Sequence, residues 1–270
     1  MSTPEIPPGA KHEPPLAEVP ITPLPRDPAW NPLDIILVAL FGFGSLMLCG
    51  FVGLAIAPHL PAFHSLTRIQ VAANPLFLVP IQALAYLIAF LFTRMFITIR
   101  AQQDFWQAIK WNFLPAGDMV TFAFSGVVLA LVTQVISHFM PIPKELPMDK
   151  YFVQPAFIYL MMAFGTLVAP LIEEVFFRGL IFPVAFRYLG LSFGTAVTAA
   201  LFAVIHQGQL AHAWAPLSLL FFVGLVLTSI RAVTKSVAAS WITHLSYNST
   251  LFALLVYATG GLKHLERLNQ

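Results

Sequence analysis

The chain has 270 residues, of which 58% are hydrophobic and only 10% are charged, and its formal net charge is +2. Its mean hydropathy is +0.80. A soluble domain carries about a quarter charged residues because its surface must be solvated, so this composition excludes an ordinary soluble globule and predicts membrane lipid as the main solvent. The small net charge gives no reason to expect nucleic acid as a partner, and a single cysteine, Cys49, excludes an intrachain disulfide.

The first 32 residues differ from the rest because they hold ten of the chain's 22 prolines. Such a segment cannot continue a helix, and it lacks the apolar area that would offset the entropy lost on ordering. We therefore expect residues 1–32 to form a disordered tail. This stretch also lacks a basic region followed by an apolar run, so it does not have the pattern of a cleavable signal peptide.

Three apolar runs in the first half are long enough for membrane-spanning helices, which need about 20 mostly apolar residues. They are Leu33–Ala57, Pro75–Ile97 and Met119–Phe139. Asn31 and Asp34 are cap candidates for the first run, with Pro32 in its first turn, and Asp118 is the expected N-cap of the third.

Between the second and third runs lies a stretch with an amphipathic pattern, near residues 101–113. Phe105, Trp106, Ile109 and Phe113 recur there at helical spacing among polar residues. The pattern predicts an interfacial amphipathic helix with its tryptophans at the level of the lipid headgroups, and an ordinary connecting loop is the alternative.

The second half holds four further apolar ranges, which are Tyr151–Tyr188, Ser192–His206, Pro216–Ile230 and Val237–Tyr257. The first is too long for one straight span at about 1.5 Å per residue, so it is either a kinked helix or two half-helices that meet near Pro170. Together, the ranges predict an all-α fold, a polytopic membrane helix bundle of seven or eight transmembrane segments. We expect residues 33–150 to form N-terminal membrane helices, 151–258 a core domain, and 259–270 a short C-terminal tail.

If the chain crosses the membrane seven times, more lysine and arginine residues lie on the side of the membrane that holds the N-terminus than on the opposite side. By the positive-inside rule, the excess favours a cytoplasmic N-terminus. The expected location is a membrane, crossed several times, and the plasma membrane if the source is bacterial.

Ionisable side chains inside spans are rare and mark functional sites or buried pairs. Glu174 and Arg178 are four residues apart, so they share a helix face and can pair. Glu173 points about 100° away and has no cation at its own i+4 position, which is Phe177. The pattern therefore separates one satisfied carboxylate from one that is free.

The position of a turn at residues 188–192 brings a histidine level with this free carboxylate. Glu173 lies before the turn and His206 after it by about the same number of residues, so an antiparallel hairpin places them at the same depth. The last span adds His244 and Asn248, four residues apart on one face. Three segments thus bring polar groups that can meet.

Each of these residues alone also has a purely structural interpretation. A single histidine near a helix end is often a satisfied polar group, a Glu–Arg pair can be structural, and an asparagine in a span often joins two helices. Phe202 is most simply a packing residue. The combination is more specific than any of its parts.

The combination resembles the CAAX prenyl endopeptidase and bacteriocin-processing (CPBP) family of intramembrane proteases, also called abortive-infection-like. Its motifs EExxxR, FxxxH and HxxxN are matched in order by "EEVFFR", "FAVIH" and "HLSYN". These stretches contain Glu173, Glu174 and Arg178, then Phe202 and His206, then His244 and Asn248. The match covers roughly residues 150–258.

The resemblance implies peptide hydrolysis within the membrane, with a peptide or a membrane protein as the substrate. By motif position, Glu173 is the general base that activates a water held with His206, and His244 and Asn248 stabilise the oxyanion. Glu174 and Arg178 support the site, and so does Phe202.

The role of a metal is open at this stage. Glu173, His206 and His244 offer two histidines and one carboxylate, the donor set of a catalytic zinc site with an open position. Against zinc, the chain has no HExxH motif. A divalent metal such as zinc and a metal-free glutamate–histidine pair fit the residues equally well, and no other cofactor is implied.

Two other functions compete with proteolysis. One is a non-catalytic membrane scaffold or bacteriocin-immunity protein on the same fold. The other is a proton-coupled transporter, since buried Glu, Arg and His also line proton paths. The absence of internal repeats and of paired broken spans argues against the transporter. The sequence leaves open the substrate and its prenylation, the side of the membrane to which the site opens, and the oligomeric state.

Overall fold

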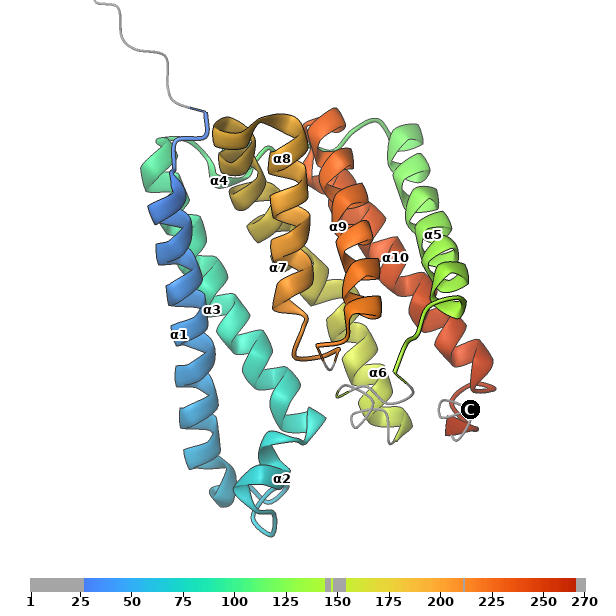
Figure 1. Ribbon diagram of the computed structural model, residues 1–270. Coiled ribbons are helices and arrows are strands. Elements are labelled where there is room, and N and C mark those ends of the chain that lie inside the picture. Colours follow the sequence, from blue (N-terminus) through green and yellow to red (C-terminus); the bar gives the residue numbers. More distant parts are fainter. Residues whose placement is uncertain (1–26, 144–146, 148–153, 211, 266–270) are drawn as a thin grey trace, which may run out of the picture.

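The computed structural model describes residues 27–143, 147, 154–210 and 212–265, and this part of the chain is helical, without a β-strand (Figure 1). The α-helices are α1 (Pro32–Ile56), α2 (Arg68–Ala72), α3 (Pro75–Ala101), α4 (Phe105–Ala108), α5 (Ala116–His138), α6 (Pro155–Ala163), α7 (Ala169–Glu174), α8 (Phe182–Ile205), α9 (Trp214–Thr234) and α10 (Val237–Ala258). The expected all-α bundle is confirmed. Figure 1 shows the start of α1 and the loop between α8 and α9 at opposite ends of the bundle.

Helix α1 begins as its sequence predicts. Asn31 accepts hydrogen bonds from the backbone N–H groups of Leu33 and Asp34, and the Asp34 side chain accepts one from the N–H of Asn31, which completes a capping box. Helix α5 differs from the prediction, because its N-cap is Pro115 and Asp118 lies inside the first turn. An aspartate in the first turn still interacts favourably with the helix dipole.

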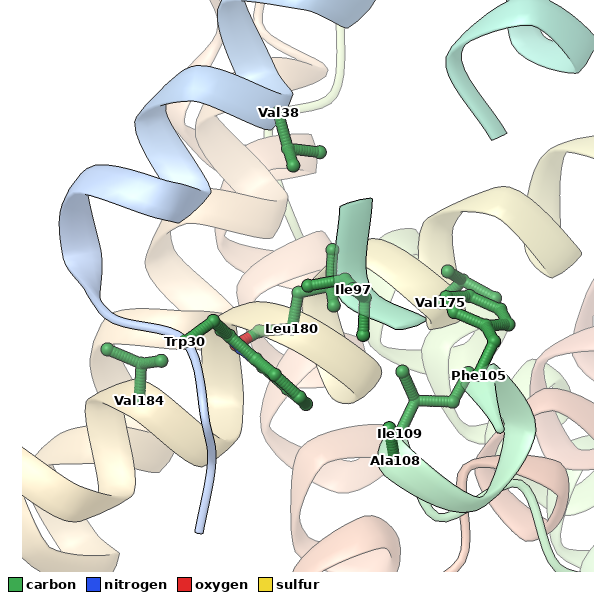
Figure 2. Packing of buried hydrophobic residues seen from close by; sticks show 9 residues of the cluster. All are labelled: Trp30, Val38, Ile97, Phe105, Ala108, Ile109, Val175, Leu180 and Val184. Atoms are coloured by element: carbon green, nitrogen blue, oxygen red, sulfur yellow. The ribbon is translucent and has the colours of Figure 1, made fainter. Parts of the chain in front are cut away.

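Residues 27–31 are packed against the core, so the expected tail of residues 1–32 is too long at its C-terminal end. Trp30 is 2% exposed, and its indole N–H donates to the carbonyl of Leu180 at 3.0 Å. Asp27 pairs with Lys110 at 2.6 Å. Figure 2 shows Trp30 in one apolar cluster with residues from α1, α3, α4 and α8. Residues 1–26 lie outside the described part.

The helix expected near residues 101–113 is shorter than predicted, because α4 spans Phe105–Ala108 only. Lys110 has a φ of 62°, which no α-helix continues through. Phe105 and Ile109 are both 0% exposed and belong to the cluster around Trp30. These two residues of the apolar side therefore pack against protein, whereas Phe113 is 66% exposed.

The long apolar range of the second half is a helix with two π-helical insertions. The segments η3 (Phe164–Val168) and η4 (Val175–Ile181) flank α7, which carries both glutamates. A π-helix bonds each N–H to the carbonyl five residues earlier, so the switch from α geometry leaves backbone carbonyls for other donors. Such insertions are frequent at functional sites.

The predicted turn at residues 188–192 is confirmed. Gly190 interrupts α8 with a φ of 73°, a conformation that glycine adopts without strain. Four residues later, Gly194 lies so close to the opposing backbone that a Cβ would be 2.8 Å from the nitrogen of Phe186. The two halves of α8 therefore form a tight hairpin that fixes the depth of the residues at its end.

By length and composition, five helical ranges of the described chain are suited to cross a membrane, namely Pro32–His59, Pro75–Ala101, Ala116–His138, Pro155–Ile205 and Trp214–Thr234. The fourth has 51 residues and contains the turn at Gly190, and α10 is not among the five. The expected count of seven or eight segments is therefore not confirmed.

Candidate functional site

The two adjacent glutamates of α7 have different environments, as the sequence predicts. Glu174 and Arg178 are both 0% exposed, and the Arg178 Nη1 donates to Glu174 Oε1 at 2.8 Å. A second nitrogen, Nη2, donates to the carbonyl of Gly224 in α9 at 3.2 Å. The opposite charges of these two buried side chains therefore neutralise each other.

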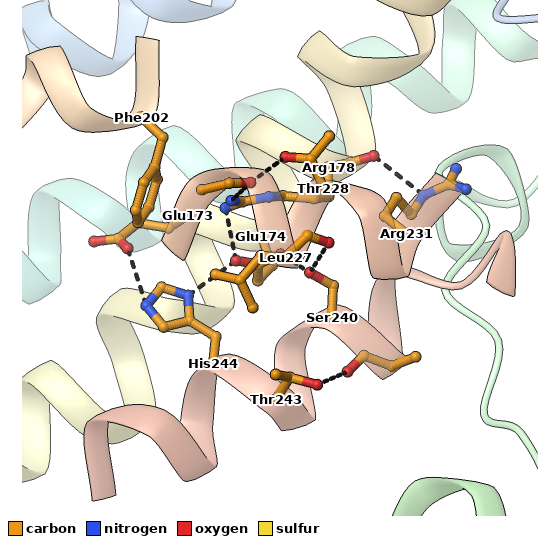
Figure 3. Close-up of polar contacts among 12 residues, drawn as sticks. Glu173, Glu174, Arg178, Phe202, Leu227, Thr228, Arg231, Ser240, Thr243 and His244 are labelled. Carbon is orange, nitrogen blue, oxygen red and sulfur yellow. Dashed lines mark hydrogen bonds and ion pairs between the residues drawn. The ribbon is translucent and has the colours of Figure 1, made fainter. Parts of the chain in front are cut away.

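The Glu174 carboxylate also accepts from two side chains of α10 (Figure 3). The Nδ1 of His244 lies 2.9 Å from Oε1, and the Ser240 hydroxyl lies 2.6 Å from Oε2. With Arg178, three donors thus converge on one carboxylate. This convergence joins α7 to α10 in the middle of the bundle.

Glu173 faces two histidines instead of an arginine. Its Oε1 lies 3.8 Å from Nε2 of His206, and its Oε2 lies 3.8 Å from Nε2 of His244. The Glu173 and His206 side chains are 17% and 15% exposed, whereas that of His244 is 4% exposed. The predicted equal depth of Glu173 and His206 is confirmed. The separations exceed a direct hydrogen bond, so both nitrogens can engage a third group beside the carboxylate.

The other ring nitrogen of each histidine is held by an acceptor. His206 Nδ1 lies 2.7 Å from the carbonyl of Phe202, and His244 Nδ1 lies 2.9 Å from Glu174. A carbonyl or carboxylate only accepts, so the proton of a neutral ring is on Nδ1 in both cases. In a neutral ring Nε2 is then an acceptor, whereas in a protonated ring it carries an N–H on the side of Glu173.

The Phe202 ring packs beside Arg178 and both histidines. Phe202 is 1% exposed, and its ring lies 4.7 Å from the guanidinium carbon of Arg178. Its centroid is 4.9 Å from that of His206 and 5.8 Å from that of His244. The ring therefore adds a cation–π contact to Arg178, whose Nε has no hydrogen-bond partner among the described residues.

Three carbonyls of the π-helical segments accept from side chains of other elements. Asn248 Nδ2 donates to Gly165 O at 2.7 Å, and Arg231 Nε donates to Arg178 O at 3.2 Å. The third acceptor is Leu180 O, which receives the indole of Trp30. Asn248 lies one helical turn beyond His244 on α10. Its amide group has two N–H donors, so one remains for an acceptor other than Gly165 O.

The donor chemistry of Glu173, His206 and His244 fits a metal, because metal-binding histidines usually donate their other ring N–H to a carbonyl or a carboxylate. Within the described residues, however, no group of three or more His, Cys, Asp or Glu side chains is found that could hold a metal ion.

Sequence reasoning missed two polar neighbours of the site. Ser240 is one turn before His244 on α10, and the i, i+4, i+8 stripe of Ser240, His244 and Asn248 was the available signal. On α3, Tyr86 accepts a hydrogen bond from Gln82 at 3.0 Å, and its ring centroid lies 5.7 Å from that of Phe164 in η3.

Fold and site together define the class: an all-α integral membrane protein with a glutamate–histidine cluster buried among its helices. Residues 155–250 match the family model described as Rce1-like, "Type II CAAX prenyl endopeptidase Rce1-like". The match covers the segment that carries the three motifs and is consistent with the CPBP family, so the resemblance seen in the sequence is confirmed for residues 155–250.

The matched segment contains all seven motif residues and begins at the first residue of α6. Comparisons with curated proteins and with solved structures found no match. The helices before α6, including α3 with Tyr86, lie outside the matched segment.

Proposed function

We propose that the protein hydrolyses a peptide bond within the membrane and that Glu173 is the general base. The observation that carries this proposal is the position of the Glu173 carboxylate, within 3.8 Å of Nε2 of both His206 and His244. Glu174, by contrast, accepts hydrogen bonds from three side chains and is 0% exposed. Of the two carboxylates, Glu173 is the one that can receive a proton from water.

In the proposed reaction, the Nε2 lone pair of His206 accepts one hydrogen of a water molecule and so holds it beside Glu173. Glu173 takes the other proton as the water oxygen bonds to the peptide carbonyl carbon. The C–N bond then breaks, and Glu173 returns the proton to the leaving amine. General base catalysis of this type contributes about 10²–10⁴-fold to a rate.

His244 and Asn248 are proposed to stabilise the oxyanion. In this role His244 carries a proton on each ring nitrogen, one held by Glu174 and the other directed at the substrate oxygen. Asn248 contributes the N–H that Gly165 does not occupy. A well-placed oxyanion donor is worth about 3–4 kcal/mol.

A cleavage assay in lipid vesicles tests this function. The substrates are a farnesylated CAAX peptide, the same peptide without the lipid, and a bacteriocin leader peptide, so the products also identify the substrate class. We expect wild-type protein to release a product from at least one of them and His206→Gln to release none. His138→Gln, at an exposed position near the end of α5, is the matched control and should cleave at the wild-type rate.

Two results of the same assay would change the proposal. No cleavage by the wild type, with the protein folded, would contradict it and favour a non-catalytic membrane scaffold. Loss of activity on chelation, with recovery when zinc is added, would favour the alternative in which Glu173, His206 and His244 hold a divalent metal.

A further inference from the structure

Ser240 is a buried hydroxyl for which the three family motifs assign no role. It is 0% exposed and lies on α10, one turn before His244. Its Oγ is 2.6 Å from Glu174 Oε2 on α7 and 3.0 Å from the carbonyl of Leu227 on α9. Ser240 therefore contacts two of the helices that pack against α10, α7 and α9.

The hydroxyl has one proton, and the shorter contact, to a charged acceptor, is the stronger hydrogen bond. Glu174 Oε1 already accepts from Arg178 and His244. Among the described residues, Ser240 is the side chain that donates to Oε2. The three donors together fix the rotation of the carboxylate, whose terminal torsion is intrinsically broad.

The rotation of this carboxylate determines the direction of the His244 ring. If Oε2 loses its donor, the carboxylate can turn to find another, and Oε1 moves with it. The Nδ1 of His244 follows Oε1, and Nε2 then changes its position relative to Glu173. Ser240 is thus linked to His244 through the Glu174 carboxylate.

We propose that Ser240 is a positioning residue that acts through Glu174 to hold Nε2 of His244 toward Glu173. The proposal rests on the peptidase function proposed above, because the direction of Nε2 matters for a rate only if it acts on the reacting groups.

The first test is Ser240→Ala in the cleavage assay. We expect kcat to fall about tenfold or more with KM unchanged, because misplacement by a fraction of an ångström costs rate without removing substrate contacts. Two controls remove a buried hydroxyl elsewhere. Ser45→Ala does so in α1, and Thr243→Val does so in α10, where the hydroxyl bonds to backbone carbonyls. Both should keep the wild-type kcat.

The second test does not need activity. In protein labelled with ¹⁵N-histidine, the His244 ring signals, assigned with His244→Gln, report the hydrogen bond to Glu174. Ser240→Ala should shift these signals and leave those of His206 in place. If the alanine variant does not fold, Ser240→Cys, with its weaker donor, should give a smaller shift and a smaller loss of kcat.

Unchanged kcat together with unchanged His244 signals in a folded Ser240→Ala variant would overturn the proposal and reduce Ser240 to a packing residue. Wild-type protein that cleaves no peptide would instead contradict the proposed function. In that case, the ring signals still decide whether Ser240 positions His244.

Discussion

The hairpin of α1 and α3 and the segment from α6 to α8 are both long and apolar, but they treat polar groups differently. In the hairpin, Asn31 and Asn74 cap regular helices, and the Asp34–Arg100 ion pair of 2.7 Å lies at the end, with Arg100 47% exposed. In the second segment, the Glu174 and Arg178 side chains are 0% exposed; Glu174 lies between two π-helical insertions, and Arg178 lies within the second.

This difference shows where the chain departs from regular geometry. The hairpin buries few polar side chains between its ends, so α-helices with satisfied termini and no π-helical insertion are sufficient. The second segment must satisfy ions inside the bundle, and its π-helical segments supply carbonyls for Asn248, Arg231 and Trp30. We infer that the irregular backbone is part of how the site is held, whereas the hairpin has a supporting role.

The largest expected difference between the two regions is the loss of unfolding free energy when the arginine of each ion pair is removed. Arg178→Met leaves the Glu174 carboxylate buried without its cation and should cost about 3–5 kcal/mol of unfolding free energy. Arg100→Met breaks a pair that is partly solvated and should cost about 0–1 kcal/mol. Unfolding titrations in detergent measure both. Equal losses would remove the distinction between the two regions.

A smaller effect is expected from adding one methyl group at a glycine of each region. At Gly194 a Cβ would lie 2.8–3.0 Å from backbone atoms of Ala185 and Phe186, which cannot move aside easily. Gly194→Ala should therefore cost about 1–3 kcal/mol and slow cleavage, because His206 is at the end of the same hairpin.

The matched variant is Gly44→Ala in α1, where a Cβ would meet no atom within 4 Å. An alanine there should be neutral or stabilise the helix by up to about 1 kcal/mol. Thermal unfolding of both variants measures the contrast. A Gly194→Ala variant as stable and as active as the wild type would mean that the hairpin at Gly190 is looser than its backbone contact indicates.

The smallest expected effect concerns the helix caps. Asn31→Ala removes the N-cap of α1 and should cost about 1 kcal/mol without changing the cleavage rate. Ser236→Ala removes the cap of α10 and also a hydrogen bond to the carbonyl of Asn112, so it should cost more and slow cleavage through α10. A cleavage rate that falls further for Asn31→Ala than for Ser236→Ala would contradict the supporting role of the hairpin.

Much of the site was predictable because it depends on helical spacing and one turn. The i,i+4 rule gives the Glu174–Arg178 pair, and the turn at residues 188–192 gives the equal depth of Glu173 and His206. The same logic gives the capping box of α1. These features need only local geometry and a count of residues.

Other features depend on contacts that no local pattern encodes. A π-helical insertion in an apolar run has no signature, because every face of such a helix is apolar. The indole of Trp30 donates to the carbonyl of Leu180, 150 residues later in the chain. The proline-rich composition does not reveal this contact, so it predicted a tail that extended through residue 32. Phe105 and Ile109 face protein instead of lipid, and an amphipathic pattern cannot separate these two apolar environments.

The central claim is that Glu173 performs the chemistry and that Glu174 supports the structure. The most direct test compares kcat and the unfolding temperature of Glu173→Gln with those of Glu174→Gln. We expect Glu173→Gln to lower kcat by at least about 10²-fold at an unchanged unfolding temperature. Glu174→Gln should lower the unfolding temperature, because an amide puts a donor where three donors already converge. A Glu173→Gln variant that cleaves at the wild-type rate would contradict the claim.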